Sequence, residues 1–453
     1  MLRALVIFTS LMLTSVRSGQ EKPASPSIDY RVAYTHELKP HRRTFPMKGI
    51  EGRSNQISLT LVVSPQGDVV EAKPSGDSEA MKFWPKVRGE VQRWKFLPFE
   101  RDGKAITVRV EEYVDLTPPE RLPSKHLPAP VIQKNSKIEI SLRRTGCFGA
   151  CPSYLVTVTT EGIKFAGQSY VVARGKHTDI VDVDEVRKLA QKFVAGDFYS
   201  MDERYRAGVT DSPTHVLSIT IDGQKKEVLD YVGSWVGMPA VITELEEEVD
   251  TLARSMRWVD GGDGLVQALQ AERFDFNTSE AQFMLKVAVN RGRSAAVRDL
   301  LAAGVPLQPI PATKSPELYS EENYLLRVGW LTCGARYPEV LQTLMEAGAS
   351  RDGQRDKDQA LAAASGWGEL KVLRALVEYG ANVNARDERG ETPIFNAANE
   401  ELMQFFIDHG ADLTIRNDKG ETVQDAASIH GPAAREEALR KAIQRFNERQ
   451  QAK

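Results

Sequence analysis

A near-repeat in the C-terminal half of the chain constrains its fold more than any other sequence feature. Residues 380–392 read GANVNARDERGET, and residues 410–422, thirty positions later, read GADLTIRNDKGET. Self-similarity at such a period is typical of stacked supersecondary units, each of which buries its apolar face only against a neighbour. The repeat therefore predicts an array of helical units that binds a partner along an extended surface.

Each copy carries the signals that end one helix and begin the next. An apolar helix runs into a glycine, which supplies the left-handed conformation that ends it. A tight turn with a second glycine follows, and then a threonine whose hydroxyl is expected to cap the next helix. These turn and capping positions are Gly380, Gly390, Thr392, Gly410, Gly420 and Thr422.

Apolar helix ends followed by glycine recur earlier, at Gly304 and Gly348. Together with the turns, this pattern resembles the ankyrin repeat over residues 262–440. We count four repeats and leave a fifth open. Phe395 and Asp425 stand where the family usually has histidine. The spacing of 30 is short for the family, which predicts a shortened helix after Ala398.

The resemblance implies a scaffold that holds a protein partner and carries no catalytic residue. Its partner-binding face is expected to include a loop at 306–324 and the charged tips of the two turns. The basic side chains at these tips are Arg386, Arg389, Arg416 and Lys419.

The N-terminus has the pattern of a secretory signal peptide over residues 1–18. Arg3 precedes an apolar run from Ala4 to Val16, which is short for a membrane span, and cleavage before Gly19 fits the flanking residues. An uncleaved membrane anchor is the alternative. With cleavage, the protein is expected to be periplasmic or secreted and to have no stable membrane insertion.

Residues 36–116 are predicted to form a small α+β domain. Strand composition at 57–63, a turn and residues 69–73 indicate a β-hairpin, and a helix is expected at 78–93. The motifs WKFLP at 94–98 and GKAITV at 103–108 resemble the C-terminal domain of TonB energy transducers. That resemblance implies binding to an outer-membrane partner by strand addition. The alternative function is therefore an envelope adaptor.

A Pro-rich segment at 117–135 is predicted to be an extended linker. It leads to a second α+β domain at 136–260, with a helix at 182–195, a hairpin across Asp222-Gly223 and a helix at 240–257. The motif RTGCFGACP at 144–152 resembles the signature of a bacterial domain family of unknown function. Residues 441–453 are predicted to be a charged tail.

The spacing of Cys147 and Cys151 is the one feature that points to covalent chemistry. A Cys-x-x-x-Cys turn with Gly149 in its middle favours a structural disulfide in an oxidising compartment. Metal binding and thiol-redox activity remain the alternatives. Cys333, in an apolar segment, is expected to be buried.

Composition and motifs narrow the function further. The net charge of −3 argues against a nucleic-acid-binding protein. The chain has no Gly-x-Ser-x-Gly, P-loop or His-Glu-x-x-His motif. We therefore expect that the protein is not an enzyme and that it binds no cofactor or metal ion. The sequence predicts a multidomain protein in which two small α+β domains precede an all-α ankyrin-type solenoid, and it leaves the partner's identity and the oligomeric state open.

Overall fold

The computed structural model of the chain describes residues 27–28, 43–50, 55–101, 104–310, 325, 328–351, 353–366, 370–397, 399–430 and 433–451. The predicted signal peptide lies outside these residues, as do 311–324 of the predicted loop. The chain forms two compact units, 1–143 with 187–249 and 144–186 with 250–453. Within the described residues, no helix combines the length and the apolar character that crossing a membrane requires.

The first sheet in the chain has five strands in the order β1-β7-β3-β4, and β2 also pairs with β7. The strands are β1 (Ser27–Ile28), β2 (Thr44–Pro46), β3 (Asn55–Val63), β4 (Val69–Ser75) and β7 (Val108–Thr117). Strands β3 and β4 form the predicted hairpin. A second, two-stranded hairpin joins β5 (Glu100–Arg101) to β6 (Lys104–Ala105).

The helix predicted at 78–93 is divided into α2 (Ser78–Met81) and α3 (Trp84–Val91). Pro85 lies in the first turn of α3, where the missing backbone N–H costs nothing. Trp94, Phe96 and Phe99 are buried with the apolar side chains of β3 and β7. Buried and more exposed side chains alternate along most of β7, because successive side chains of a strand point to opposite faces and one face of β7 lies on the core.

Thr117, the first residue of the Pro-rich segment, ends β7, and residues 118–135 have no helix or strand. Hydrogen bonds hold these residues in place. The backbone N–H of Arg121 donates to the carbonyl of Gly237 (2.7 Å), and that of Leu127 donates to the Ser200 hydroxyl (2.7 Å). The segment is therefore attached along the domain that follows it.

A second sheet contains seven strands in the order β11-β10-β9-β8-β13-β14-β12. The strands are β8 (Ile138–Arg144), β9 (Ser153–Thr159), β10 (Gly162–Ser169), β11 (Gly175–Asp179), β12 (Arg204–Arg206), β13 (His215–Ile221) and β14 (Gln224–Tyr231). The turn from β13 to β14 has positive φ at Asp222 (48°) and Gly223 (86°), which matches the predicted hairpin. Strand β11 was not predicted from the sequence.

Helix α4 (Val183–Ala195) agrees with the helix predicted at 182–195. Two short 3₁₀ helices, η1 (Phe198–Ser200) and η2 (Gly233–Val236), follow in the same domain. The prediction of one continuous helix at 240–257 is wrong, because the segment contains two helices, α5 (Ala240–Leu252) and α6 (Ser255–Asp260). Arg254 between them has a left-handed φ of 50°, which no helix continues through.

The backbone of the α6 segment forms hydrogen bonds with the segment that follows β10. The N–H groups of Val172 and Ala173 donate to the carbonyls of Val259 (3.0 Å) and Trp258 (2.9 Å). The break before α6 places Trp258 in the core, where it is fully buried.

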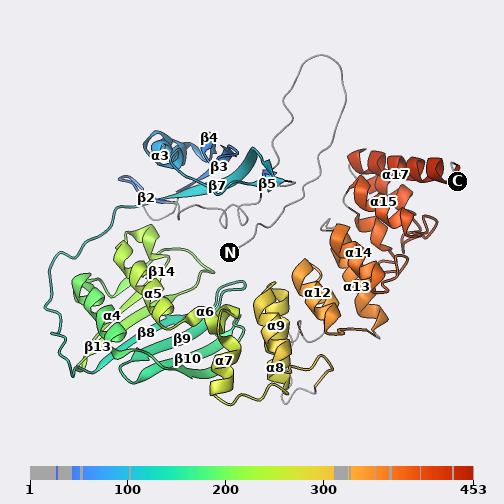
Figure 1. The fold of residues 1–453 in the computed structure, drawn as a ribbon. Helices are drawn as coiled ribbons and strands as arrows, with labels where there is room; N and C mark the ends of the chain where they lie inside the picture. The colour runs from blue at the N-terminus through green and yellow to red at the C-terminus, as the bar shows by residue number, and fades with distance from the viewer. Residues whose placement is uncertain are drawn as a thin grey trace. The chain divides into compact units, whose positions relative to one another are not determined.

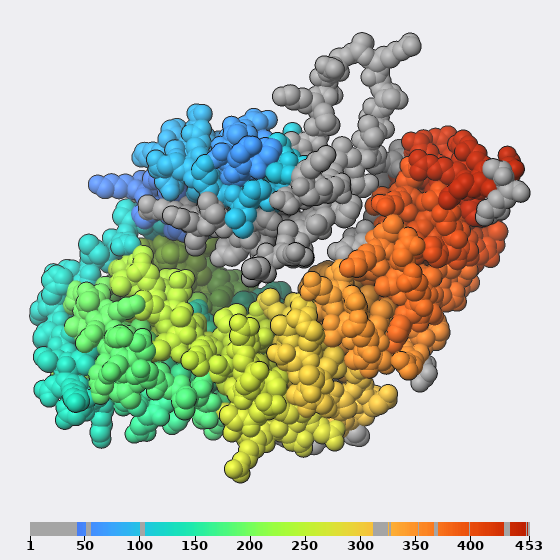
Figure 2. Space-filling model, in the orientation of Figure 1, coloured from blue at the N-terminus to red at the C-terminus, as the bar shows by residue number. Residues whose placement is uncertain are grey.

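The C-terminal region is helical, and its helices follow one another in sequence order (Figure 1). The described residues of this region run in colour from yellow to red (Figure 2). The helices are α7 (Leu265–Ala271), α8 (Ser279–Asn290), α9 (Ser294–Ala302), α11 (Trp330–Gly334), α12 (Pro338–Glu346), α13 (Gln354–Ser365), α14 (Leu370–Glu378), η3 (Pro393–Asn396), α15 (Glu400–Asp408), α16 (Val423–His430) and α17 (Ala433–Gln451).

The predicted helix-ending glycines are confirmed. Positive φ values are found at Gly304 (95°), Gly348 (81°), Gly380 (98°) and Gly410 (87°). The shortened helix predicted after Ala398 is wrong, because α15, which follows that position, has nine residues like α14. The shortened element is the one before it, η3, a 3₁₀ turn of four residues.

The boundary drawn for a charged tail at 441–453 is corrected by the structure. Residues 441–451 are the second half of α17, which packs against α15 and buries Leu439 and Ala442. Arg445 pairs with Glu400 (2.5 Å), and Arg449 pairs with Asp408 (2.9 Å). The charges seen in the sequence therefore attach this helix to the last repeat.

Candidate functional site

The two turns of the near-repeat have the same backbone geometry. In the first, the N–H of Asp387 donates to the carbonyl of Glu391 (2.9 Å). In the second, Asn417 donates to Glu421 at the same distance. The side chains of Asp387 and Asn417 each accept further backbone N–H groups of their own turn. Sequence self-similarity thus corresponds to structural repetition.

Side chains and backbone groups also join neighbouring turns to each other. Asn384 bridges the two copies, since its amide donates to the carbonyl of Gly410 (2.9 Å) and accepts from the N–H of Asp412 (2.7 Å). The N–H of Asp418 donates to the carbonyl of Arg389 (2.9 Å). The turns are therefore held in a fixed spacing before any partner binds.

All four predicted partner-binding side chains are exposed at these turns. The three arginines have acidic neighbours at the following distances: Arg386–Asp418 3.6 Å, Arg389–Glu391 2.9 Å and Arg416–Asp425 3.3 Å. Lys419 has no ion-pair partner among the residues that the structure describes. Exposed ion pairs contribute little, on the order of 0–1 kcal/mol, so a partner's carboxylates could replace these neighbours. Their role in binding stays a prediction.

The two capping threonines differ from each other. The Thr422 hydroxyl accepts from the N–H of Asp425 (3.2 Å). The Asp425 carboxylate accepts from the Thr422 backbone N–H (3.0 Å) and from its hydroxyl (2.9 Å), and these two bonds lower the pKa of Asp425. The sequence predicted the hydroxyl cap, and the reciprocal bonds of Thr422 and Asp425 make it a capping box.

The cap predicted at Thr392 is wrong. Its hydroxyl is buried and makes no hydrogen bond among the described residues. The N–H of Phe395, which a capping hydroxyl would need, donates instead to the Thr392 carbonyl in the 3₁₀ turn. Phe395 also offers no carboxylate in the place of Asp425.

In the central domain, Cys147 and Cys151 form a disulfide, with sulfur atoms 1.92 Å and Cα atoms 5.5 Å apart. Both flanks of the loop are attached to Asp250. Arg144 pairs with its carboxylate (2.9 Å), and the Tyr154 hydroxyl donates to it (2.9 Å). Burial, and then the charge of Asp250, raise the pKa of Tyr154 well above its usual range. The structure therefore explains three residues of the RTGCFGACP motif, namely Arg144, Cys147 and Cys151.

We expect the double substitution Cys147→Ser with Cys151→Ser to destabilise this loop by about 2 kcal/mol, because the bond closes a short ring and removes unfolded-state entropy. Hydrogen exchange of peptides covering 144–160 measures the effect. A reductant should produce the same increase in exchange in the unsubstituted protein and no change in the variant. Equal exchange in all four samples would contradict a stabilising role for the bond.

Cys333 is buried, as predicted. Burial raises its pKa to about 11, and its sulfur lies 3.8 Å from the carbonyl of Lys286. A thiol in this environment reacts slowly with alkylating agents. It is therefore an internal reference for experiments on the other two cysteines.

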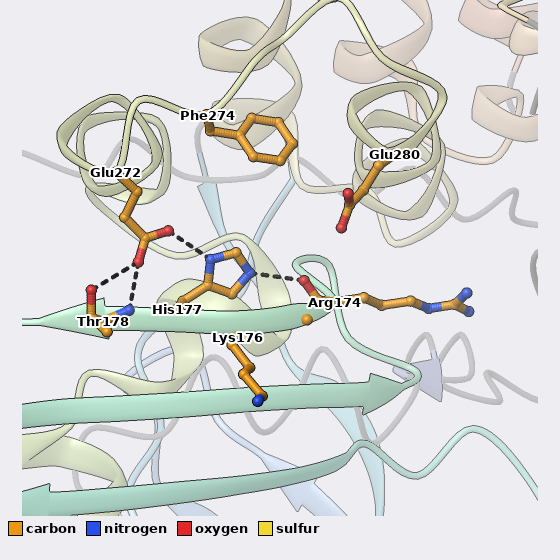
Figure 3. A pocket seen from close by; sticks show the side chains of 8 residues that line it. Arg174, Lys176, His177, Thr178, Glu272, Phe274 and Glu280 are labelled. Atoms are coloured by element: carbon orange, nitrogen blue, oxygen red, sulfur yellow. Dashed lines mark hydrogen bonds and ion pairs between the residues drawn. The ribbon is translucent and has the colours of Figure 1, made fainter. Parts of the chain in front are cut away.

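A pocket of about 560 Å³ lies beside strand β11. In Figure 3, the side chains of β11 form one side, and Phe274 and Glu280 lie opposite them. Its lining residues are Arg174, Gly175, Lys176, His177, Thr178, Glu272, Phe274 and Glu280.

His177 has both ring nitrogens engaged in this pocket. Its Nδ1 lies 2.9 Å from the Glu272 carboxylate, and its Nε2 lies 2.9 Å from the Arg174 carbonyl (Figure 3). The ring also stacks on Trp258, with centroids 4.4 Å apart. Because both nitrogens face oxygen acceptors, His177 is suited to fixing Glu272 against β11 rather than to proton transfer. The sequence offered no signal for this contact, since β11 itself was missed.

Comparison with known proteins agrees with two of the resemblances. Residues 138–253 match the family described as "Domain of unknown function (DUF6438)", and residues 330–417 match "Ankyrin repeats (3 copies)". Human Rabankyrin-5 is 39% identical over 59 residues, which cover 12% of this chain and 5% of Rabankyrin-5. Neither matched family indicates a catalytic activity, and the TonB-like character of 36–116 stays a prediction. The chain therefore contains a DUF6438 domain followed by ankyrin repeats.

Proposed function

We propose that the protein is an exported scaffold that holds a protein partner on its ankyrin repeats. The observation that carries this proposal is the pair of equivalent turns at 386–391 and 416–421, which present basic side chains at a fixed spacing. Ankyrin repeats are a binding architecture, and successive repeats of a solenoid form one extended surface. The described exposed charges favour a partner segment rich in carboxylates.

Affinity in this proposal depends on the turns being ordered before binding. Asn384 and the Asp418–Arg389 contact already fix the two turns relative to each other. Binding therefore carries no entropic cost of ordering the turns, and only the side chains at the contact lose conformational freedom. Because the arginines exchange local acidic neighbours for those of the partner, binding should weaken as salt concentration rises.

The test uses Lys419, since its replacement removes no ion pair among the described residues. We expect Lys419→Glu to weaken partner binding about tenfold through charge reversal at the contact. A photoreactive amino acid at position 419 of the full chain, in the producing cells, captures the partner, whose affinity for each variant is then measured by titration.

Lys441→Glu in α17 is the control for charge reversal at an exposed lysine outside the turns, and it also removes the Lys441–Glu437 ion pair (3.4 Å). It should leave the affinity unchanged. Two outcomes would contradict binding at the turns. One is that a photoreactive amino acid at position 441 in α17 captures a partner while one at position 419 does not. The other is that the wild type and Lys419→Glu bind the partner with equal affinity.

Export is part of the proposal and has its own support. A disulfide at Cys147–Cys151 persists in oxidising compartments and is rare in the cytosol. Labelling of cell fractions with a thiol reagent before lysis tests it. We expect protein from the envelope or the medium to show blocked cysteines, and protein that lacks residues 1–18 to show two reactive thiols.

A second candidate function is an adaptor that acts through the N-terminal domain. Strand β4 ends the strand order of its sheet, and Val70 on it is 64% exposed. An edge strand of this kind accepts an added strand from a partner. If this function is correct, a partner captured at position 70 should still be captured after residues 262–451 are deleted.

A thiol-redox function is the third candidate, and it rests on the same cysteine pair. A cycling disulfide would give a population in which Cys147 is readily alkylated, with Cys333 as the slow reference. A fully blocked pair under all growth conditions would eliminate this function.

A further inference from the structure

Three side chains that can bind a metal meet in the central domain, away from the disulfide loop. They are His215 on β13, Asp230 on β14 and Glu246 on α5. His215 and Asp230 are direct cross-strand partners in the antiparallel pair, so the sheet register alone brings them together. Glu246 is added when α5 packs on the domain. The three ligand atoms all lie within 4.8 Å of one another.

The distances are close to those of a coordinated ion. His215 Nδ1 lies 2.8 Å from Glu246 Oε2 and 3.8 Å from Asp230 Oδ2. Bonds of about 2.0–2.2 Å in a tetrahedral Zn²⁺ site place neighbouring donor atoms roughly 3.3 Å apart. The two observed separations lie on either side of this value, so small side-chain rotations would bring the set to coordination geometry.

Burial distinguishes this group from ordinary surface charges. The Glu246 side chain is 2% exposed, that of Asp230 is 12% and that of His215 is 22%. Two carboxylates removed from water need a compensating positive charge close by. A divalent cation bound by all three side chains would balance the charge of the two carboxylates, with the imidazole as its third ligand.

The orientation of Asp230 is fixed by a second contact. Its Oδ1 accepts from the backbone N–H of Gly233 (2.6 Å), which leaves Oδ2 facing His215. A Cβ at position 233 would lie 2.8 Å from Asp230 Oδ1 and 2.7 Å from the Met238 sulfur, so a larger residue there would displace the Asp230 carboxylate. Such support of a ligand carboxylate is typical of metal sites, where outer contacts orient the ligands.

We propose that His215, Asp230 and Glu246 form a binding site for a divalent transition-metal ion, Zn²⁺ in the first instance. A donor set of one imidazole nitrogen and two carboxylate oxygens suits Zn²⁺ better than Ca²⁺ or Mg²⁺, which prefer oxygen alone. The ion joins α5 to the β13–β14 hairpin. This site is independent of the ankyrin repeats and of the scaffold function.

The experiment uses the full, oxidised chain after treatment with a chelator. Zn²⁺ is titrated in competition with a chromophoric chelator, and bound metal is counted by elemental analysis. We expect one tightly bound ion per chain, and an affinity that falls as pH is lowered because the imidazole must lose a proton to bind. His215→Gln and Glu246→Gln should each weaken binding by at least about 100-fold, since losing a ligand exceeds the 10–100-fold effect of outer contacts.

His177→Gln is the matched control. His177 likewise pairs with a glutamate carboxylate, at 2.9 Å, and its side chain is more buried than that of His215, but it belongs to no group of three ligands among the described residues. It should leave stoichiometry and affinity unchanged. Gly233→Ala should weaken binding without removing a ligand, which a surface site elsewhere would not show.

Substitution with Co²⁺ gives a readout of the ligands themselves. If the ligands are nitrogen and oxygen atoms, the Co²⁺ protein should show the visible absorption bands of a four- or five-coordinate ion. It should lack thiolate-to-cobalt charge-transfer absorption, and that result would exclude the cysteines as ligands. The proposal is overturned if the wild type binds Zn²⁺ no more tightly than His215→Gln. Loss of binding to the same extent in His177→Gln would overturn it too. In either case, the three side chains form a hydrogen-bonded cluster and no metal site.

Discussion

Replacing Phe406 with alanine is expected to unfold the last repeats and to abolish partner capture at position 419. Phe406 is fully buried in α15, and its ring packs edge-on against Phe405 with centroids 5.4 Å apart. Its carbonyl also accepts from the N–H of Ala411, at the start of the second repeat copy. Truncation of a buried phenylalanine costs about 3–5 kcal/mol through lost burial and the cavity left behind.

Hydrogen exchange of the full chain measures this effect locally, because a multidomain protein has no single free energy of unfolding. Peptides covering 399–430 should lose protection in Phe406→Ala, while those covering 138–179 should not change. Ile429→Ala in α16 is the control, since Ile429 is 64% exposed and its truncation should change little. Protection that survives in Phe406→Ala would mean that the repeats do not share one core.

Trp258→Ala is expected to have an effect of similar size, about 3–5 kcal/mol, in the other part of the second unit. Trp258 is fully buried and stacks on His177 at 4.4 Å, with Phe165 at 6.1 Å. Its removal takes away the surface against which His177 holds Glu272. Strand β11 and the start of the repeat region should therefore both loosen.

Peptides covering 162–179 and 265–275 report this change by hydrogen exchange, and both should exchange faster together. Met256→Ala in the same helix is the control, because Met256 is exposed. If only the strand peptides respond, the His177–Glu272 contact does not couple the two segments. Zn²⁺ binding should stay intact, since Trp258 is not part of the proposed metal site.

Local sequence signals predicted the repeats well because each signal acts within a few residues. The φ values of Gly380 and Gly410 and the turn at Asp222-Gly223 follow from backbone sterics, which need no distant partner. The hairpin β3–β4 and the disulfide at Cys147–Cys151 are likewise short-range features. Where a local signal had to compete with packing, as for Thr392 and the helix at 240–257, the prediction was wrong.

In the candidate sites, too, the sequence predicted the short-range features and missed the contacts between distant residues. The exposed basic residues at the repeat turns could be named from the sequence, but their acidic neighbours could not. Asp250, which holds both Arg144 and Tyr154, lies 106 and 96 positions away from them in the chain. No spacing rule connects residues so far apart.

The sequence by itself determined that the chain contains repeated helical units, two sheet-containing segments and a cysteine pair at bridging distance, because turns, caps and short loops are encoded by neighbouring residues. Only the tertiary structure decided that His215, Asp230 and Glu246 meet, that α6 buries Trp258 against His177, and that 441–451 continues a packed helix. Those contacts depend on strand register and helix packing, which the whole domain sets through the burial of its core.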